Sequence, residues 1–115
     1  MMRRGDIVTV DFDPVRGNEV SKHRPAIVVS NDGANRRAEQ LGRGVITVVP
    51  VTSNTERIFP FQVLLDDVPG LRVASKAQAE QVRSVSVERV GRVLGRLSVK
   101  QLSELDNALR LHLAL

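Results

Sequence analysis

The chain has 115 residues, 42% of them hydrophobic and only 3% aromatic, which allows one compact domain spanning residues 1–115 with an aliphatic core and leaves no room for a second domain. The absence of cysteine excludes disulfides and cysteine-based metal sites, and residues 1–6 lack the apolar stretch of a signal peptide, so we expect a cytoplasmic protein. The formal net charge of +4 is carried mostly by arginine, which favours an anionic partner such as a nucleic acid or an acidic protein segment, although charge alone fits an ordinary soluble protein equally well.

The first half of the chain contains four segments with the composition of β-strands. Residues 7–13 alternate apolar and polar side chains, whereas residues 26–30 and 45–51 are nearly continuous apolar runs. Pro50 predicts a bulge or a sheet edge near the end of the third segment, because proline cannot donate to a ladder. The fourth strand is predicted over residues 61–65. A short polar helix or a loop over residues 34–41 separates the second strand from the third.

The second half predicts two more strands and a final helix. One strand is expected around residues 76–82 and the last over residues 91–97. Ser98 followed three residues later by Gln101 is typical of a capping box, and Leu102, Leu105, Leu109 and His112 then recur at helical spacing. Many short strands followed by one amphipathic helix predict a mostly β fold with a C-terminal α-helix, in which that helix covers a small, closed, mostly antiparallel sheet.

A charged loop before the second strand is the strongest candidate for a functional site. Glu19, Lys22, His23 and Arg24 fall within six residues, and Pro25 then begins the buried strand. The strand holds the base of the loop, so Arg24 is placed at a rigid edge. Cationic side chains on such an anchored loop suit an anionic substrate.

Further polar candidates follow two other strands: Thr52 and Ser53 come after residues 48–51, and Glu80 and Gln81 precede Arg83. Each candidate also has an ordinary structural explanation. Arg24 suits a surface cation, Thr52 a turn residue, and Glu19, His23 and Gln81 solvated surface positions. No phosphate-binding loop, metal-binding motif or nucleophilic serine motif is present, so an enzyme with this sequence is expected to need neither metal nor cofactor.

An ordered series of short motifs covers nearly the whole chain and resembles the MazF/PemK family of toxin endoribonucleases. The motifs are Arg4-Gly5-Asp6, Val10-Asp11-Phe12-Asp13-Pro14, Gly17-Asn18-Glu19, residues 23–31, residues 48–53, residues 60–63, residues 79–84 and the closing helix. The resemblance implies an SH3-like small barrel of the MazF/Kid/CcdB type and a homodimer. It also implies metal-independent cleavage of single-stranded RNA at short motifs, and a cognate antitoxin whose acidic, flexible tail covers the RNA groove.

The resemblance also implies roles for individual residues. The catalytic arginine that precedes proline matches Arg24, the active-site threonine after the third strand matches Thr52, and the loop glutamate matches Glu19. The residues expected to contact RNA are Asn18, Lys22, His23, Ser53, Phe61, Glu80, Gln81 and Arg83. Residues 36–44 have no counterpart in the family pattern, so the RNA motif that is cut stays open.

RNA cleavage without a metal can use the RNA's own 2′-hydroxyl as the nucleophile, which leaves a 2′,3′-cyclic phosphate and a 5′-hydroxyl. Arg24 stays protonated at neutral pH and therefore suits stabilisation of the charged phosphorane or donation of a proton. Thr52 can add a neutral hydrogen bond. The general base is then expected to be Glu19, with His23 as the next candidate.

Two other functions are compatible with a small barrel. A non-catalytic gyrase poison of the CcdB type would act through its C-terminal helix and would need no Arg24–Thr52 pair. A nucleic-acid-binding module without turnover is weakly supported, because three phenylalanines offer few surfaces for base stacking.

Overall fold

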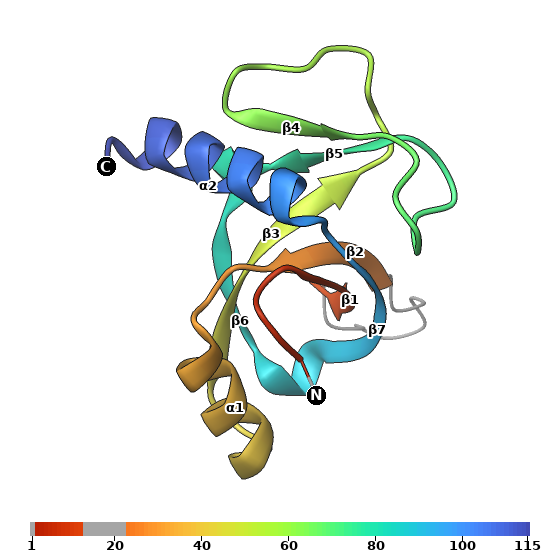
Figure 1. The fold of residues 1–115 in the computed structure, drawn as a ribbon. Coiled ribbons are helices and arrows are strands. Elements are labelled where there is room, and N and C mark those ends of the chain that lie inside the picture. The colour runs from red at the N-terminus through yellow and green to blue at the C-terminus, as the bar shows by residue number, and fades with distance from the viewer. Residues whose placement is uncertain (1, 13–22) are drawn as a thin grey trace.

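The computed structural model describes residues 2–12 and 23–115. Its elements form one strongly curled antiparallel sheet with a helix at each end of the molecule (Figure 1). The strands are β1 (Asp6–Asp11), β2 (His23–Val28), β3 (Val45–Thr52), β4 (Gln62–Leu65), β5 (Ser75–Gln78), β6 (Arg83–Ser86) and β7 (Val90–Arg96). The α-helices are α1 (Asp32–Leu41) and α2 (Val99–Leu113), and two short 3₁₀ turns are η1 (Ala79–Gln81) and η2 (Val87–Arg89). The predicted fold class is confirmed.

The sheet is open in its hydrogen bonding, and the prediction of a closed sheet is wrong in this respect. Its strand order is β4-β5-β3-β2-β1-β7, so β4 and β7 are the two edge strands of this series. Strand β6 lies outside the series and pairs with the first half of β3. The curl of the strands still brings the loop after β4 against β7. The barrel is therefore completed by a loop contact and not by a strand ladder.

Strand β3 is the centre of the fold because it pairs with three other strands. One of its edges follows β2 from Val48 to Pro50, and its other edge pairs with β6 up to Val48 and with β5 from Val51. Pro50 lies where this second edge passes from one partner to the next, a position that needs no donated ladder bond. The β2–β3 ladder has no register shift between Val48 and Pro50 and ends at Pro50. Of the bulge and the sheet edge predicted there, no bulge occurs between these residues, and the proline marks a change of partner on the other edge of β3.

One predicted element differs from the observed one, and one alternative is confirmed. The strand expected around residues 76–82 ends at Gln78 and continues as the 3₁₀ turn η1, after which the chain enters β6, a strand that the sequence did not indicate. Of the helix and the loop left open for residues 34–41, the structure forms a helix, Asp32–Leu41. Its start is capped by the Asn31 side chain, which accepts a hydrogen bond from the Ala34 N–H, and its end by Gly42 in the left-handed conformation.

Helix α2 covers one of the two hydrophobic clusters of the core. Leu105 and Ala108 are buried among side chains from the sheet, including Ile27 and Leu65. The predicted capping box of Ser98 and Gln101 is present, with both reciprocal hydrogen bonds formed. His112 is exposed, which corrects its expected place on the apolar face of the helix. Neither α-helix of the described part is long and apolar enough to cross a membrane.

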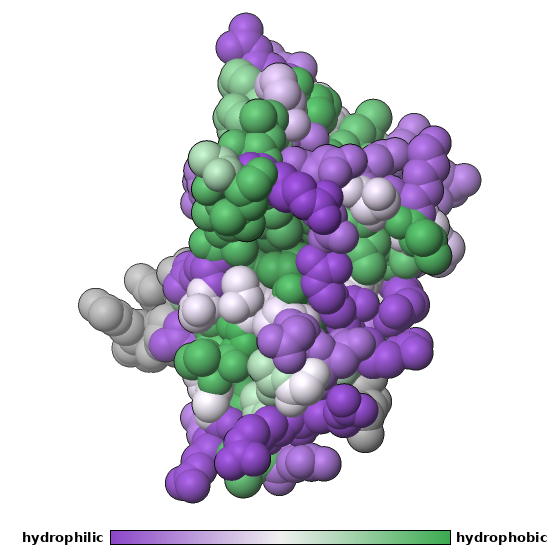
Figure 2. All heavy atoms as spheres, turned by 60° about the vertical axis from the view of Figure 1, so that its left-hand side comes forward, coloured by the Kyte–Doolittle hydropathy of each residue, from purple (hydrophilic) through white to green (hydrophobic). Residues whose placement is uncertain are grey.

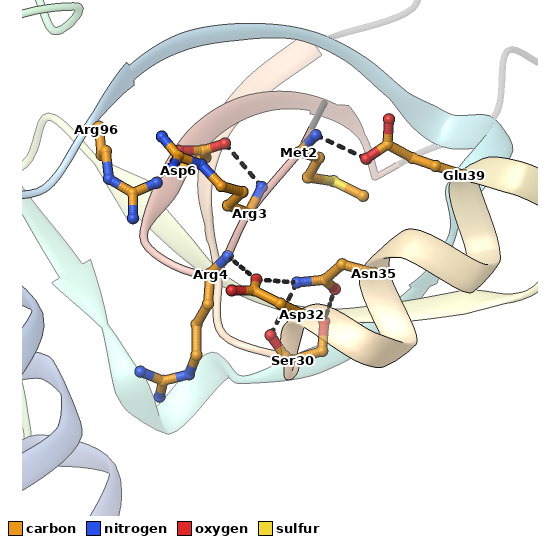
Figure 3. Close-up of polar contacts among 9 residues, drawn as sticks. All are labelled: Met2, Arg3, Arg4, Asp6, Ser30, Asp32, Asn35, Glu39 and Arg96. Atoms are coloured by element: carbon orange, nitrogen blue, oxygen red, sulfur yellow. Dashed lines mark hydrogen bonds and ion pairs between the residues drawn. The ribbon is translucent and has the colours of Figure 1, made fainter.

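The segment before β1 connects both helices to the sheet through polar contacts, and Figure 3 shows those with α1. The Arg4 guanidinium pairs with Asp106 of α2 at 2.6 Å, and the Arg4 backbone N–H donates to Asp32 at the start of α1. The buried Asn35 side chain donates to the Ser30 carbonyl and also contacts Asp32. Asp6 pairs with Arg96 of β7. These contacts place α1 and α2 relative to the strands between them.

We expect Asp32 to make the stability of the fold depend on pH in the acid range. The hydrogen bond from the Arg4 backbone is the largest effect that lowers the pKa of Asp32 from its ordinary value of 3.8. A lowered folded-state pKa means that the ionised carboxylate stabilises the fold at neutral pH, and that this contribution is lost as the pH falls below 3.8. Urea unfolding of wild type and Asp32→Asn at pH 7, 5 and 3 should show a deficit at pH 7 that shrinks toward pH 3. The exposed Asp66→Asn is the control, and a deficit of Asp32→Asn that grows toward pH 3 would contradict this assignment.

Candidate active site

Two clefts meet where β3 ends and β2 begins. These two strand ends lie on the right of Figure 1. The large cleft has a volume of about 660 Å³ and the small cleft about 320 Å³. The residues that line both of them are Arg24, Val51 and Thr52. The two side chains predicted to be catalytic therefore stand at the boundary between the clefts.

The ends of β2 and β3 bring Arg24 and Thr52 to the same place. The β2–β3 ladder ends at the pair Ala26–Pro50, and Arg24 and Thr52 lie two residues beyond this pair on the two strands. On the other edge of β2, Arg24 pairs with Val10 of β1. Residues that are 28 positions apart in the sequence thus line the same two clefts, and Arg24 is exposed there.

The Thr52 side chain has the structural role in a turn that the sequence left open, and its hydroxyl can still donate to a ligand. Its hydroxyl oxygen accepts a hydrogen bond from the Asn54 backbone N–H at 3.2 Å, which forms the turn after β3. The hydroxyl hydrogen is not used in that bond, so it can be donated to a ligand in either cleft. Lys76, opposite Thr52 on β5, donates instead to the Arg57 carbonyl at 2.7 Å and holds the loop after β3.

The structure places four of the predicted RNA-contacting residues in the clefts. His23 and Ser53 line the large cleft, and Gln81 and Arg83 line the small one. The Arg83 guanidinium lies 5.1 Å from the centre of the Phe12 ring, which also lines the small cleft. A flat cation over an aromatic ring beside a glutamine amide provides both a stacking surface and hydrogen-bonding groups for a nucleobase.

Two predicted contacts lie elsewhere. Glu80 accepts a hydrogen bond from the Gln62 side chain, because the 3₁₀ turn η1 directs it toward β4, and it lines neither cleft. Phe61 stacks on Phe59 with 5.3 Å between ring centres and also contacts His112 of α2. Neither residue lines either cleft, and a contact of Glu80 or Phe61 with RNA stays a prediction. The candidates Asn18, Glu19 and Lys22 lie outside the described residues.

The clefts also contain polar residues that the sequence reading did not select. Thr9, Arg72 and Arg92 line the large cleft, and Gln78 lines the small cleft. The available signal for Arg72 was its position two residues after the Pro69-Gly70 turn, where a loop presents its side chains. Arg92 gave no such signal, because it lies within a strand.

The electrostatic character of the site is cationic. No acidic side chain is among the described residues that line either cleft, and Arg24, Arg72 and Arg92 all line the large one. The two ion pairs within residues 2–12 and 23–115 involve Arg4 and Arg96, outside the clefts. The cleft arginines are therefore available to an anionic ligand.

Comparison with known proteins identifies the family of the chain. Residues 3–113 match the family described as PemK-like, MazF-like toxin of type II toxin-antitoxin system. Endoribonuclease MazF9 of Mycobacterium tuberculosis is 60% identical over 116 residues, which covers 100% of this chain and 98% of that protein.

The crystal structure of MazF (Form-I) from Deinococcus radiodurans matches with a TM-score of 0.76 and 26% identity, covering 99% of this chain and 97% of that one. An endoribonuclease in complex with its cognate antitoxin, from a mycobacterial species, matches with a TM-score of 0.79 and 22% identity, covering 100% and 97% of the two chains. The chain belongs to the family of PemK-like, MazF-like toxins of type II toxin–antitoxin systems.

Proposed function

We propose that this chain is the toxin of a type II pair and that it inhibits translation and growth by cutting single-stranded RNA at short sequence motifs. The observation that carries the proposal is the shared position of Arg24 and Thr52, which line both clefts. An RNA strand that passes from one cleft to the other carries a phosphate across these two side chains. Membership of the toxin family and the 60% identity to a protein named as an endoribonuclease support the same activity.

Cleavage proceeds by attack of the 2′-hydroxyl on the adjacent phosphorus, with expulsion of the 5′-oxygen of the next nucleotide. The products are a 2′,3′-cyclic phosphate and a 5′-hydroxyl. The phosphorane carries more negative charge than the ground state, and the Arg24 guanidinium has several donors to offer it. The Thr52 hydroxyl adds one neutral donor from the opposite strand.

Proton transfer in this reaction needs a base for the 2′-hydroxyl and an acid for the leaving oxygen. Glu19 remains the proposed base, on the basis of the family pattern alone. His23 is the other candidate, supported by its place in the large cleft next to Arg24. No metal ion is required, because the nucleophile belongs to the substrate.

The partners follow from the charge and surface of the molecule. The described lining of the large cleft contains three arginines and no carboxylate. An acidic antitoxin tail therefore suits this cleft.

We further propose a cytoplasmic homodimer. Figure 2 shows apolar side chains gathered over the C-terminal half of α2 and the groove beside it, where Val29, Val82, Leu109, Leu113 and Leu115 line a hollow of about 320 Å³. This surface supports an apolar contact with a second copy.

The proposal is tested by incubating the purified protein with a defined single-stranded RNA in EDTA. We expect discrete fragments with cyclic-phosphate ends, and sedimentation of the same sample should give the mass of two chains. Intact RNA would contradict the nuclease. RNA that is retained on the protein without being cut would indicate a binding module, and a protein that neither binds nor cuts RNA but inhibits gyrase would indicate the gyrase poison.

A further inference from the structure

The wall of the large cleft is formed by a close approach of two glycines. A Cβ on Gly70 would lie 2.3 Å from the Leu94 carbonyl oxygen of β7, and a Cβ on Gly95 would lie 2.3 Å from the Pro69 carbonyl oxygen. Gly70 also has a φ of +98°, which other residues rarely adopt. The loop between β4 and β5 can therefore sit directly on β7 because neither partner has a side chain there.

This contact brings two arginines to the same cleft from opposite ends of the sheet. Arg72 follows Gly70 on the docked loop, and Arg92 lies on β7 three residues before Gly95. Both are exposed, and both line the large cleft with Arg24. The Arg92 backbone is held separately, since its N–H donates to the Thr9 hydroxyl at 3.0 Å. The pair stands on anchored backbone rather than on a free loop tip.

The chemistry of the large cleft differs from that of the small one. No aromatic residue of the Phe, Tyr or Trp type is among the described residues that line the large cleft, and arginine supplies its positive charge. The small cleft instead has Phe12 with Gln78 and Gln81, which suit a base. Arginines bind phosphate through paired N–H donors, so the large cleft suits the sugar–phosphate backbone.

We propose that Arg72 and Arg92 form a second phosphate subsite, which binds the phosphodiester next to the one that is cut. This inference rests on the proposed function. Arg24 is assigned to the scissile phosphate, and the Arg72–Arg92 pair positions the RNA by holding the strand one nucleotide away. Because these arginines do not touch the reacting bond, they contribute to substrate binding and not to the chemical step.

The double variant Arg72→Gln/Arg92→Gln tests this assignment on an RNA in which the wild-type cut has been mapped. We expect KM to rise about tenfold or more while kcat at saturating RNA stays within about threefold, because a remote phosphate contact is made equally in the ground state and the transition state. The salt dependence of kcat/KM should also weaken, with a log–log slope smaller in magnitude by about 0.7 for the loss of one phosphate contact. The matched control Arg37→Gln/Arg43→Gln removes the same charge from exposed positions outside both clefts and should keep the wild-type slope and KM.

Short RNAs then locate the subsite. One kind of RNA ends one nucleotide to the 5′ side of the cut, and the other kind ends one nucleotide to the 3′ side. Each kind is made both with and without a phosphate at that end. Wild type should cut one of the phosphorylated forms about tenfold faster at low concentration, and the Arg72→Gln/Arg92→Gln variant should lose that advantage. A double variant that keeps the wild-type KM and salt slope, or that still responds to the terminal phosphate, would overturn the subsite. Failure of wild type to cut any RNA would instead overturn the nuclease itself, so the two failures are distinguishable.

Discussion

Replacement of Arg24 by alanine should reduce RNA cleavage by about 10³-fold or more while the fold is retained, because a preorganised donor aimed at the phosphorane is removed. Arg24 is exposed at the start of β2 and carries no ion pair among the described residues, so its loss leaves no buried charge behind. RNA binding should persist, since Arg72, Arg83 and Arg92 still line the two clefts. The loss should therefore fall on kcat, measured in single-turnover assays with excess protein.

The control for this experiment is Arg37→Ala, which removes the same charge from the exposed face of α1. It should cleave at the wild-type rate. Circular dichroism and urea unfolding of both variants separate loss of chemistry from loss of folding. Wild-type cleavage by Arg24→Ala would show that the catalytic assignment is wrong, and a rise in KM with unchanged kcat would move Arg24 from the reacting phosphate to a binding contact.

Replacement of Leu105 by alanine should destabilise the protein by about 3 kcal/mol, the typical cost of a leucine-to-alanine cavity in a packed core. Leu105 is 0% exposed and joins α2 to the sheet through the cluster that contains Ile27 and Val49. These two residues lie on β2 and β3, the strands that carry Arg24 and Thr52. Loss of this packing weakens the attachment of the helix to the strands that support the active site.

Val99→Ala is the matched control, because Val99 lies in the same helix but is 89% exposed. Its stability should remain within about 0.5 kcal/mol of wild type, as for surface substitutions in general. Equilibrium urea denaturation of both variants gives the comparison. A change below about 1 kcal/mol for Leu105→Ala would mean that the cavity collapses or that α2 contributes little to the stability of the sheet.

Most strands and the start of α2 could be predicted from the sequence, because their signals are local. The alternation in β1 and the Ser98–Gln101 capping box depend on neighbouring residues alone. Strand β6 was missed for the opposite reason. Only the 3₁₀ turn at Ala79–Gln81 separates β5 from β6, and a continuous polar–apolar stretch does not reveal such a turn. The same turn directs Glu80 toward Gln62 and away from the clefts.

The shared position of Arg24 and Thr52 was predicted from family resemblance, and the neighbouring ends of β2 and β3 explain it physically. The arginines of the large-cleft wall could not be predicted in this way. Arg92 reaches the cleft through the β1–β7 ladder, whose register shifts twice, between Ile7 and Val8 and between Val8 and Val10. Such irregularities change which face a side chain occupies, and sequence periodicity does not report them. Arg72 depends on the contact between Gly70 and Gly95, which are 25 positions apart in the chain.

The large cleft takes Thr9 from β1 and Arg92 from β7, with Arg24 from β2 and Thr52 from β3. During translation, a growing polypeptide therefore has no complete cleft until β7 has left the ribosome and paired with β1. A product that ends before β7 lacks that wall. Formation of the cleft is thus coupled to nearly complete synthesis of the chain.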